Sequence, residues 1–188
     1  EKNRHYEKLR KNGFHQDARA QLEKGQYDVY SLWYALPVRE MLALPDFRED
    51  PEWIAARIFP PIRPAEAKKA LELLKRVGLA RRGEDGRLRP AETNLITPPN
   101  VQSLAVRNYH RAMLEKAAAS LDGLPQETRN VTSLTFTLRK DQYEELCKRI
   151  WEFEREVIEK NTEEPGGSSE VFVLGVQLFP LTRKKEES

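Results

Sequence analysis

Apolar residues recur at helical spacing through residues 64–77, the most regular stretch of the chain. One arc of the helical wheel is apolar and the opposite arc is charged. The apolar arc consists of Ala67, Ala70, Leu71, Leu73, Leu74 and Val77, and the charged arc of Lys68, Lys69, Glu72, Lys75 and Arg76. Pro64 suits the first helical turn, and Gly78 suits the residue just past the helix end. The pattern therefore predicts an amphipathic helix with one buried side and one solvent-facing side.

Two helices are predicted before this one. Residues 50–52, Asp-Pro-Glu, form a helix start signal with an N-cap, a proline at the first position and an acid against the helix dipole. The apolar face that follows ends at a turn over residues 59–62. An earlier helix is expected from Tyr27 to Leu44, and Pro37 predicts a kink or a break within it.

Two short basic segments follow the helix of residues 64–77 and are joined by Gly83-Glu84-Asp85-Gly86. The Asp-Gly pair can adopt the positive φ angles that a tight β-hairpin needs. A helix followed at once by a hairpin is typical of the last helix and wing of a winged helix-turn-helix. Residues 27–97 are therefore predicted to form such a module, and residues 1–26 are expected to be a helical linker.

The positive charge of the chain is concentrated in residues 63–90. This segment has nine Lys or Arg and four Asp or Glu, a net charge of +5, whereas the rest of the chain has 23 basic and 26 acidic residues, a net charge of −3. A surface that binds the phosphates of double-stranded DNA needs such a concentration of basic side chains. The predicted DNA-binding residues are Arg63, Lys68, Lys69, Lys75, Arg76, Arg81, Arg82, Arg87 and Arg89.

The same pattern also suits an ordinary solvated helix, because Lys and Glu at spacings of three and four residues are common on protein surfaces. Glu72 lies in the middle of the charged arc, where it would repel phosphates, and the arc lacks the Asn, Gln, Ser and Thr that often read base edges. The alternative is a module that does not contact DNA. It would instead serve dimerisation or effector sensing in a regulator whose DNA-binding domain lies upstream.

Residues 101–188 are predicted to form a second module, which begins with a helix over residues 102–120. The apolar face of that helix consists of Val106, Tyr109, His110, Met113, Leu114, Ala117 and Leu121. Side chains of one kind recur at every second residue in segments 131–138 and 171–179, which predicts two strands, and a helix is predicted between them over residues 140–160. This order predicts a parallel, right-handed β-α-β unit. The predicted fold class is therefore α+β. Because a two-stranded sheet is marginal alone, we expect further strands from the first module or from a second copy in a homodimer.

The histidines and the cysteine do not indicate catalysis. None of His5, His15 and His110 has a partner at metal-ligand spacing, and His110 is expected in the core. Cys147 lies on the apolar stripe of its helix, where it is expected to be a small buried hydrophobe. The sequence contains no recognisable combination of a nucleophile, a base and an orienting group that would form a catalytic site. It therefore predicts neither an enzyme nor a cofactor or metal site.

Glu154 falls within the otherwise apolar stripe of the helix over residues 140–160. A carboxylate in that position needs a partner or a raised pKa. One interpretation is that the helix end projects and Glu154 reaches water. The other is a polar effector pocket that Glu154 forms with Arg107, His110 or Arg111 of the preceding helix.

The cellular setting follows from what the sequence lacks. No run of roughly 18 apolar residues is present, so no transmembrane helix is expected, and no signal peptide is visible. A single Cys excludes an internal disulfide, so we expect a cytoplasmic protein. The chain begins with Glu rather than Met, and we expect a fragment of a longer protein.

Four segments together carry a resemblance. They are Asp50-Pro51-Glu52-Trp53-Ile54-Ala55, Ala70-Leu71-Glu72-Leu73-Leu74, Ser103-Leu104-Ala105-Val106-Arg107-Asn108-Tyr109-His110-Arg111-Ala112-Met113-Leu114 and Val176-Gln177-Leu178-Phe179-Pro180-Leu181-Thr182. In this order they resemble the bacterial family called domain of unknown function 4423. The resemblance implies a cytoplasmic DNA-binding regulator, typically with a further helix-turn-helix domain upstream, and it transfers no catalytic residues. It also implies Ser or Thr caps where Arg63 and Arg139 stand, so each helix is expected to lack about 1 kcal/mol of capping energy.

Overall fold

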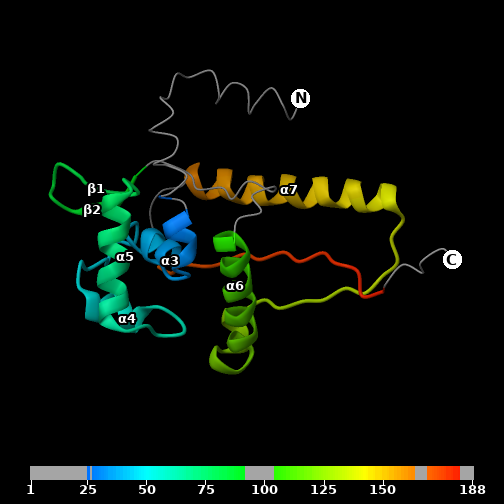
Figure 1. Ribbon diagram of the computed structural model, residues 1–188, viewed down its shortest axis with the longest axis horizontal. Coiled ribbons are helices and arrows are strands. Elements are labelled where there is room, and N and C mark those ends of the chain that lie inside the picture. The colour runs from blue at the N-terminus through cyan, green and yellow to red at the C-terminus, as the bar shows by residue number, and fades with distance from the viewer. Residues whose placement is uncertain (1–24, 26, 92–103, 164–168, 183–188) are drawn as a thin grey trace, which may run out of the picture.

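The computed structural model describes residues 25, 27–91, 104–163 and 169–182. Short helices and a hairpin gather at one end of the molecule, a further helix lies beside them, and a long helix extends away (Figure 1). The elements are α3 (Ala35–Met41), α4 (Pro51–Arg57), α5 (Pro64–Arg76), β1 (Ala80–Arg82), β2 (Leu88–Pro90), α6 (Leu104–Gly123), the 3-10 helix η1 (Gln126–Thr128) and α7 (Lys140–Glu163). The protein is thus α+β, as predicted. Nearly all of the linker predicted over residues 1–26 lies outside the described residues, as does the predicted start of α6.

The buried core lies between α3, α4 and α5. Val38 of α3, Ile54 of α4 and Leu74 of α5 are completely buried in it. The buried residues of α5 are Ala67, Ala70, Leu71, Leu73 and Leu74. The predicted apolar arc is therefore confirmed, with only Val77 half-buried at its end.

The helix predicted from Tyr27 to Leu44 is broken. Residues 27–31 are helical, residues 32–34 are not, and α3 begins at Ala35. Pro37 lies in the first turn of α3, where backbone N–H groups have no intrahelical partner in any case. A continuous helix would have placed the proline ring against the carbonyl of Trp33. The predicted break is confirmed and has this steric cause.

Two glycines in the left-handed region shape the hairpin that follows α5, one before its first strand and one in its turn. Gly78 has a φ of 76° just past the end of α5, and Gly86 has a φ of 73° in the turn between β1 and β2. The strands are antiparallel, with Ala80 opposite Pro90 and Arg81 opposite Arg89. The hairpin is fastened to α3, because the buried Arg39 donates a hydrogen bond of 2.9 Å from Nη2 to the carbonyl of Ala91.

The helix α6 is joined to the first half of the chain by two contacts, one near the start of the helix and one near its middle. The rings of Tyr30 and Tyr109 meet edge to face with centroids 5.4 Å apart, and burial raises the pKa of Tyr109 to about 12. The ammonium of Lys116 lies 4.6 Å from the centroid of the Trp33 ring, at the distance of a cation–π interaction.

A third contact lies at the end of α6. A Cβ atom at Gly123 would stand 2.6 Å from the ring of Phe59, in the turn between α4 and α5. The tip of the Phe59 ring therefore packs directly on the backbone of Gly123, and a larger residue at this position would require the partly exposed ring to move aside.

The apolar face predicted for α6 is only partly correct. Val106 is buried and Tyr109 is half-buried, but His110, Leu114 and Leu121 are exposed. The side of the helix that faces the first half of the chain instead includes Ala105, buried beside Tyr30, and Lys116, which lies over the ring of Trp33. Placing His110 in the core was therefore wrong.

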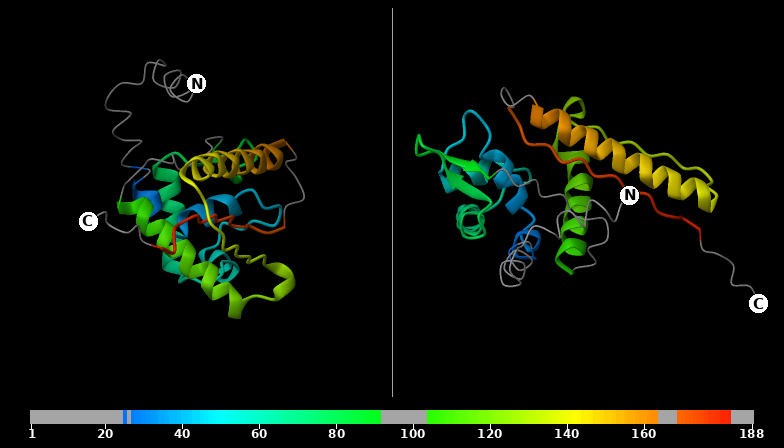
Figure 2. Two further views of the ribbon diagram at one scale, coloured as in Figure 1. Left: turned by 90° about the vertical axis from the view of Figure 1, so that its right-hand side faces the viewer. Right: turned by 90° about the horizontal axis from the view of Figure 1, so that it is seen from above.

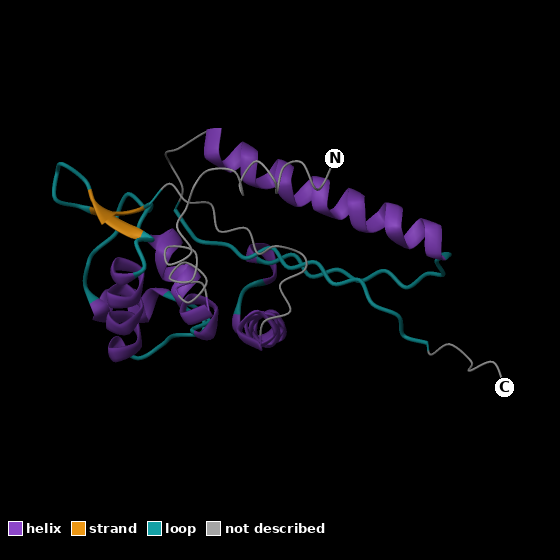
Figure 3. Cartoon of the chain, turned by 45° about the horizontal axis from the view of Figure 1, so that its top comes forward, coloured by secondary structure: helices purple, strands orange, loops and turns teal. Residues whose placement is uncertain are grey.

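The β-α-β prediction is correct for the helix and wrong for the sheet. Residues 140–163 form α7, but residues 131–138 and 171–179 make no ladder hydrogen bonds, and the sheet in the described residues contains only β1 and β2. Both segments run in the same direction, opposite to α7, and both are drawn as loops (Figures 1, 2 and 3). The chain therefore follows the course of a β-α-β unit, but the two segments do not pair as strands. Two strands alone bury too little side-chain surface to stabilise a sheet.

No helix among the described residues is long and apolar enough to cross a lipid bilayer.

We expect the Leu74→Ala substitution to lower the free energy of unfolding by about 2–5 kcal/mol, because it opens a cavity in the core between α3, α4 and α5. The Leu104→Ala substitution is the matched control, since Leu104 lies at the start of α6 with 62% of its surface exposed. Its effect should stay within about 0.5 kcal/mol. Urea denaturation measures both, and equal effects would contradict the placement of the core.

Candidate nucleic-acid interface

The charged arc of α5 and the hairpin that follows it carry many exposed basic side chains, with Glu72 exposed among those of the arc. The apolar arc of α5 is buried and its charged arc faces solvent, and only three residues separate the end of the helix from the hairpin (Figure 1). We call this surface the basic face. The nine predicted DNA-binding residues are all exposed on it: Arg63, Lys68, Lys69, Lys75, Arg76, Arg81, Arg82, Arg87 and Arg89.

Glu49 links α5 to the hairpin. Its carboxylate accepts a hydrogen bond of 2.5 Å from the ammonium of Lys75 and one of 3.1 Å from the guanidinium of Arg82. The hydrogen bond from Lys75, followed by the positive charges of Lys75 and Arg82, holds the pKa of Glu49 below its usual range. Arg82 also donates a hydrogen bond of 2.8 Å to the carbonyl of Gly86 in the turn of the hairpin. Both cations are thereby oriented along the basic face.

Three further arginines of the basic face have carboxylate partners. These are Arg76 with Asp28 at 3.1 Å, Arg89 with Asp85 at 2.7 Å, and Arg63 with Glu66 at 3.2 Å. Five of the nine basic side chains, counting Lys75 and Arg82, are thus paired. Exposed pairs of this kind contribute less than about 1 kcal/mol each, so a phosphate can replace the carboxylate at little cost.

Lys68 and Lys69 differ from these five residues. Both are exposed in the middle of α5, and neither has an ion pair with any other residue that the structure describes. Arg81 lies on β1 directly opposite Arg89 of β2, so two guanidinium groups share one part of the hairpin. Like charges directly opposite each other are unfavourable in a sheet, and the carboxylate of Asp85, 2.7 Å from Arg89, offsets part of that repulsion.

The cap of α5 is made by Glu66. The side chain of Arg63 accepts no capping hydrogen bond, but the carboxylate of Glu66 accepts one of 2.9 Å from the backbone N–H of Arg63. The hydrogen bonds from Arg63 lower the pKa of Glu66. At α7 the side chain of Gln142 accepts in the same way from the backbone N–H of Arg139, at 3.0 Å. Half of a capping box therefore remains at each arginine.

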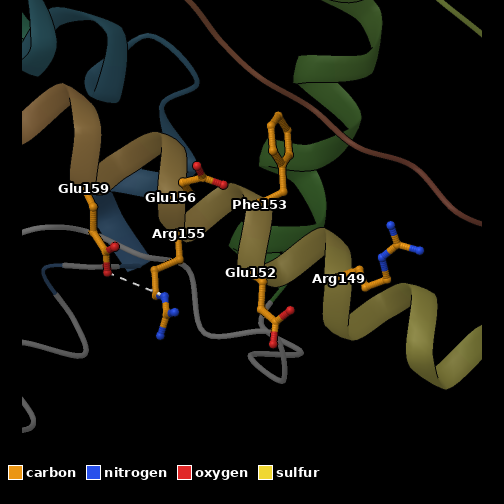
Figure 4. Close-up of a pocket in the computed structure, with 6 residues that line it drawn as sticks. All are labelled: Arg149, Glu152, Phe153, Arg155, Glu156 and Glu159. Carbon is orange, nitrogen blue, oxygen red and sulfur yellow. Dashed lines mark ion pairs between the residues drawn. The ribbon is translucent and has the colours of Figure 1, made fainter.

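The predicted effector pocket is not assembled. Arg107 and His110 are exposed on α6 and Glu154 is half-buried on α7, and no hydrogen bond or ion pair joins these three among the described contacts. An open hollow does lie along α7 (Figure 4), lined by Arg149, Glu152, Phe153, Arg155, Glu156 and Glu159. All of these residues belong to one helix, so no second element encloses the space, and it offers a ligand a single wall.

The other residues considered for chemistry lie apart. Cys147 is half-buried on α7 rather than fully buried, while His5 and His15 are outside the described residues. No group of three or more His, Cys, Asp or Glu in the described part of the chain could hold a metal ion.

Comparison with known proteins places the chain in a family. The sequence profile described as Domain of unknown function (DUF4423) matches residues 15–181. The chain belongs to this family. The DUF4423 match spans the basic face, α6 and α7, so both halves of the chain are parts of the family's domain. Searches of curated proteins and of solved structures gave no match.

We expect the Glu49→Gln substitution to lower the free energy of unfolding by up to about 1 kcal/mol at neutral pH. Because folding lowers the pKa of Glu49, the ionised carboxylate stabilises the fold above the ordinary glutamate pKa. That contribution is lost as the pH falls through the lowered pKa. The difference between variant and wild type should therefore vanish in acid, as measured by urea denaturation over a pH series.

The Glu84→Gln substitution is the control for this experiment. Glu84 is exposed in the turn of the hairpin and has no ion pair with another described residue. The free energy of unfolding should stay within about 0.5 kcal/mol of wild type at every pH. If the two variants show the same pH dependence, Glu49 does not stabilise the fold through Lys75 and Arg82.

Proposed function

We propose that residues 27–91 form a winged helix-turn-helix and that this protein is a cytoplasmic, DNA-binding regulator of transcription. The observation that supports the proposal best is the basic face, in which an amphipathic helix shows its charged arc to solvent and leads at once into an arginine-bearing hairpin. In this proposal α5 is the recognition helix, which enters the major groove, and β1 and β2 form the wing beside it.

The helices before α5 suit this role. The buried residues Ile54 and Ala55 of α4 pack towards α5, and a short turn joins the two helices. The backbone N–H of Ile62 in that turn donates a hydrogen bond of 3.2 Å to the carbonyl of Ala55, which ties the turn to α4. In a helix-turn-helix the first helix supports the second in this way and leaves the outer side of the second helix open to DNA.

The chemistry of the basic face favours phosphate contacts over base reading. Its exposed cations are lysines and arginines, whereas α5 shows no Asn, Gln, Ser or Thr to solvent. Lys68 and Lys69 would bind phosphates first, because neither would have to break an ion pair with a described carboxylate to do so. Lys75, Arg76 and Arg82 would follow by exchanging their carboxylate partners for phosphates. Such contacts position a protein on DNA and add affinity without selecting a sequence.

A second function is supported by the carboxylate partners. Five of the nine basic side chains are paired within the chain, which reduces the net charge that DNA would meet. This observation favours a module that acts in dimerisation or effector sensing, with DNA contacts made by a domain upstream. Neither function assigns a catalytic role to this chain, and both predict that the protein is not an enzyme.

Fluorescence anisotropy with a mixed-sequence DNA duplex over a salt series tests the proposal. We expect binding that weakens steeply with salt, and the double substitution Lys68→Glu and Lys69→Glu should abolish it while the protein stays folded. The control for the change in net charge reverses Lys148 and Lys160, two exposed lysines of α7 that pair with Glu152 and Glu156, and it should bind as wild type does. Absence of binding at low salt by the folded wild type would support the second function instead.

The Glu49→Gln substitution gives a further test on the same duplex. It removes the carboxylate that Lys75 and Arg82 share, so two more cations become available to phosphates. We expect tighter binding and one or two additional phosphate contacts. Each contact should steepen the slope of the logarithm of the binding constant against the logarithm of the salt concentration by about 0.9. The Glu84→Gln variant makes the same change in net charge without releasing a pair. An equal gain in both variants would contradict direct contact by Lys75 and Arg82.

A further inference from the structure

Glu72 lies at the centre of the charged arc of α5. At about 100° per residue, it falls midway between Lys75 at one margin of the arc and Lys69 at the other. On the same helical wheel, Lys68 lies between Lys75 and Glu72. Arg76 lies between Glu72 and Lys69, and all five residues are exposed. One carboxylate is therefore flanked by two cations on each side, along the middle of the helix.

Glu72 does not pair with the cations beside it. A glutamate four residues before an arginine is well placed for an ion pair within a helix, yet Arg76 pairs with Asp28 at 3.1 Å instead. Lys75 likewise pairs with Glu49. Glu72 has no ion pair with any residue that the structure describes. Its carboxylate is thus available to accept hydrogen bonds from a ligand, although cations stand on both sides of it.

The order of charges across α5 matches the cross-section of the major groove of DNA. The sugar-phosphate backbones line the two sides of the groove, and the base edges form its floor. Cations at the margins of an inserted helix therefore face phosphates, and a side chain at the centre faces base edges. A carboxylate is repelled least at the centre, because that position is farthest from both rows of phosphates.

We infer that Glu72 selects a base pair by accepting a hydrogen bond from the N4 amino group of cytosine, which rests on the proposed function of α5 as a recognition helix. An ionised carboxylate only accepts hydrogen bonds. In the major groove guanine presents two acceptors and thymine presents an acceptor and a methyl group, so both are unfavourable partners. Adenine offers its N6 amino group, but its N7 acceptor lies beside that group. Cytosine alone presents a donor without an acceptor on its own edge.

Glu72 gives α5 a means of discrimination that its cations lack. Phosphate contacts by the lysines and arginines are the same on every sequence, whereas the hydrogen bond to cytosine forms at one base pair only. On other sequences the carboxylate finds no donor and still repels the phosphates. Glu72 therefore weakens binding to DNA in general and restores it where cytosine stands below the centre of the helix.

Selection from a pool of duplexes with a randomised core, followed by sequencing, tests the inference with the full chain. We expect the bound duplexes to share one position at which C·G is strongly preferred. In fluorescence anisotropy at one fixed salt concentration, each of the other three base pairs at that position should weaken binding roughly 5- to 100-fold.

Three variants assign the preference to its side chain. Glu72→Gln should change the preferred pair from C·G to A·T, because a glutamine amide can donate to N7 and accept from N6 of adenine. Glu72→Ala should bind DNA without a preference at that position. Both should fold, since the side chain is exposed and both residues suit a helix. Glu84→Gln is the matched control, because it makes the same change in net charge in the turn of the hairpin and should keep the C·G preference.

The outcomes separate this inference from the proposed function. A folded wild-type chain that binds no duplex at low salt would overturn both. Salt-dependent binding without a preferred C·G pair would overturn the selection of cytosine and leave the phosphate contacts in place. A C·G preference that persists in Glu72→Gln would likewise overturn the role of Glu72, since the preference would then come from another side chain.

Discussion

Burial of the apolar arc of α5 is the interaction on which the rest of the structure depends. Leu74 meets Val38 of α3 and Ile54 of α4 in the completely buried part of the core, and this packing fixes the rotation of α5 about its own axis. The charged arc faces solvent only because the opposite arc is held in this way. Loss of that packing would release α4 and the hairpin together, since each is positioned by α5.

Elements governed by local chemistry were predictable from the sequence. The Asp50 cap, the break before Pro37 and the left-handed residues Gly78 and Gly86 depend on neighbours within a few positions, and the structure shows each of them. The apolar arc of α5 was equally clear, because its period matches that of a helix over nearly four turns.

Features governed by distant residues were not predictable. The carboxylates of Glu49 and Asp28 lie 26 and 48 residues from the cations that they pair with, and no spacing rule connects such positions. The rotation of α6 about its axis depends on the shape of the surface that it meets. The helix has apolar residues on more than one side, so its sequence alone did not predict which side is buried. The alternation in residues 131–138 predicted a strand, but the structure shows none there, because alternation alone does not provide a pairing neighbour.

The contact between Gly123 and Phe59 couples parts of the chain that are far apart in sequence. The tip of the ring lies next to the α6 backbone, so the end of α6 contacts the turn that leads into α5. The other end of α6 is held by the edge-to-face contact between the rings of Tyr30 and Tyr109. Both ends of α6 are therefore held against the first half of the chain by aromatic side chains, one at its start and one at its end.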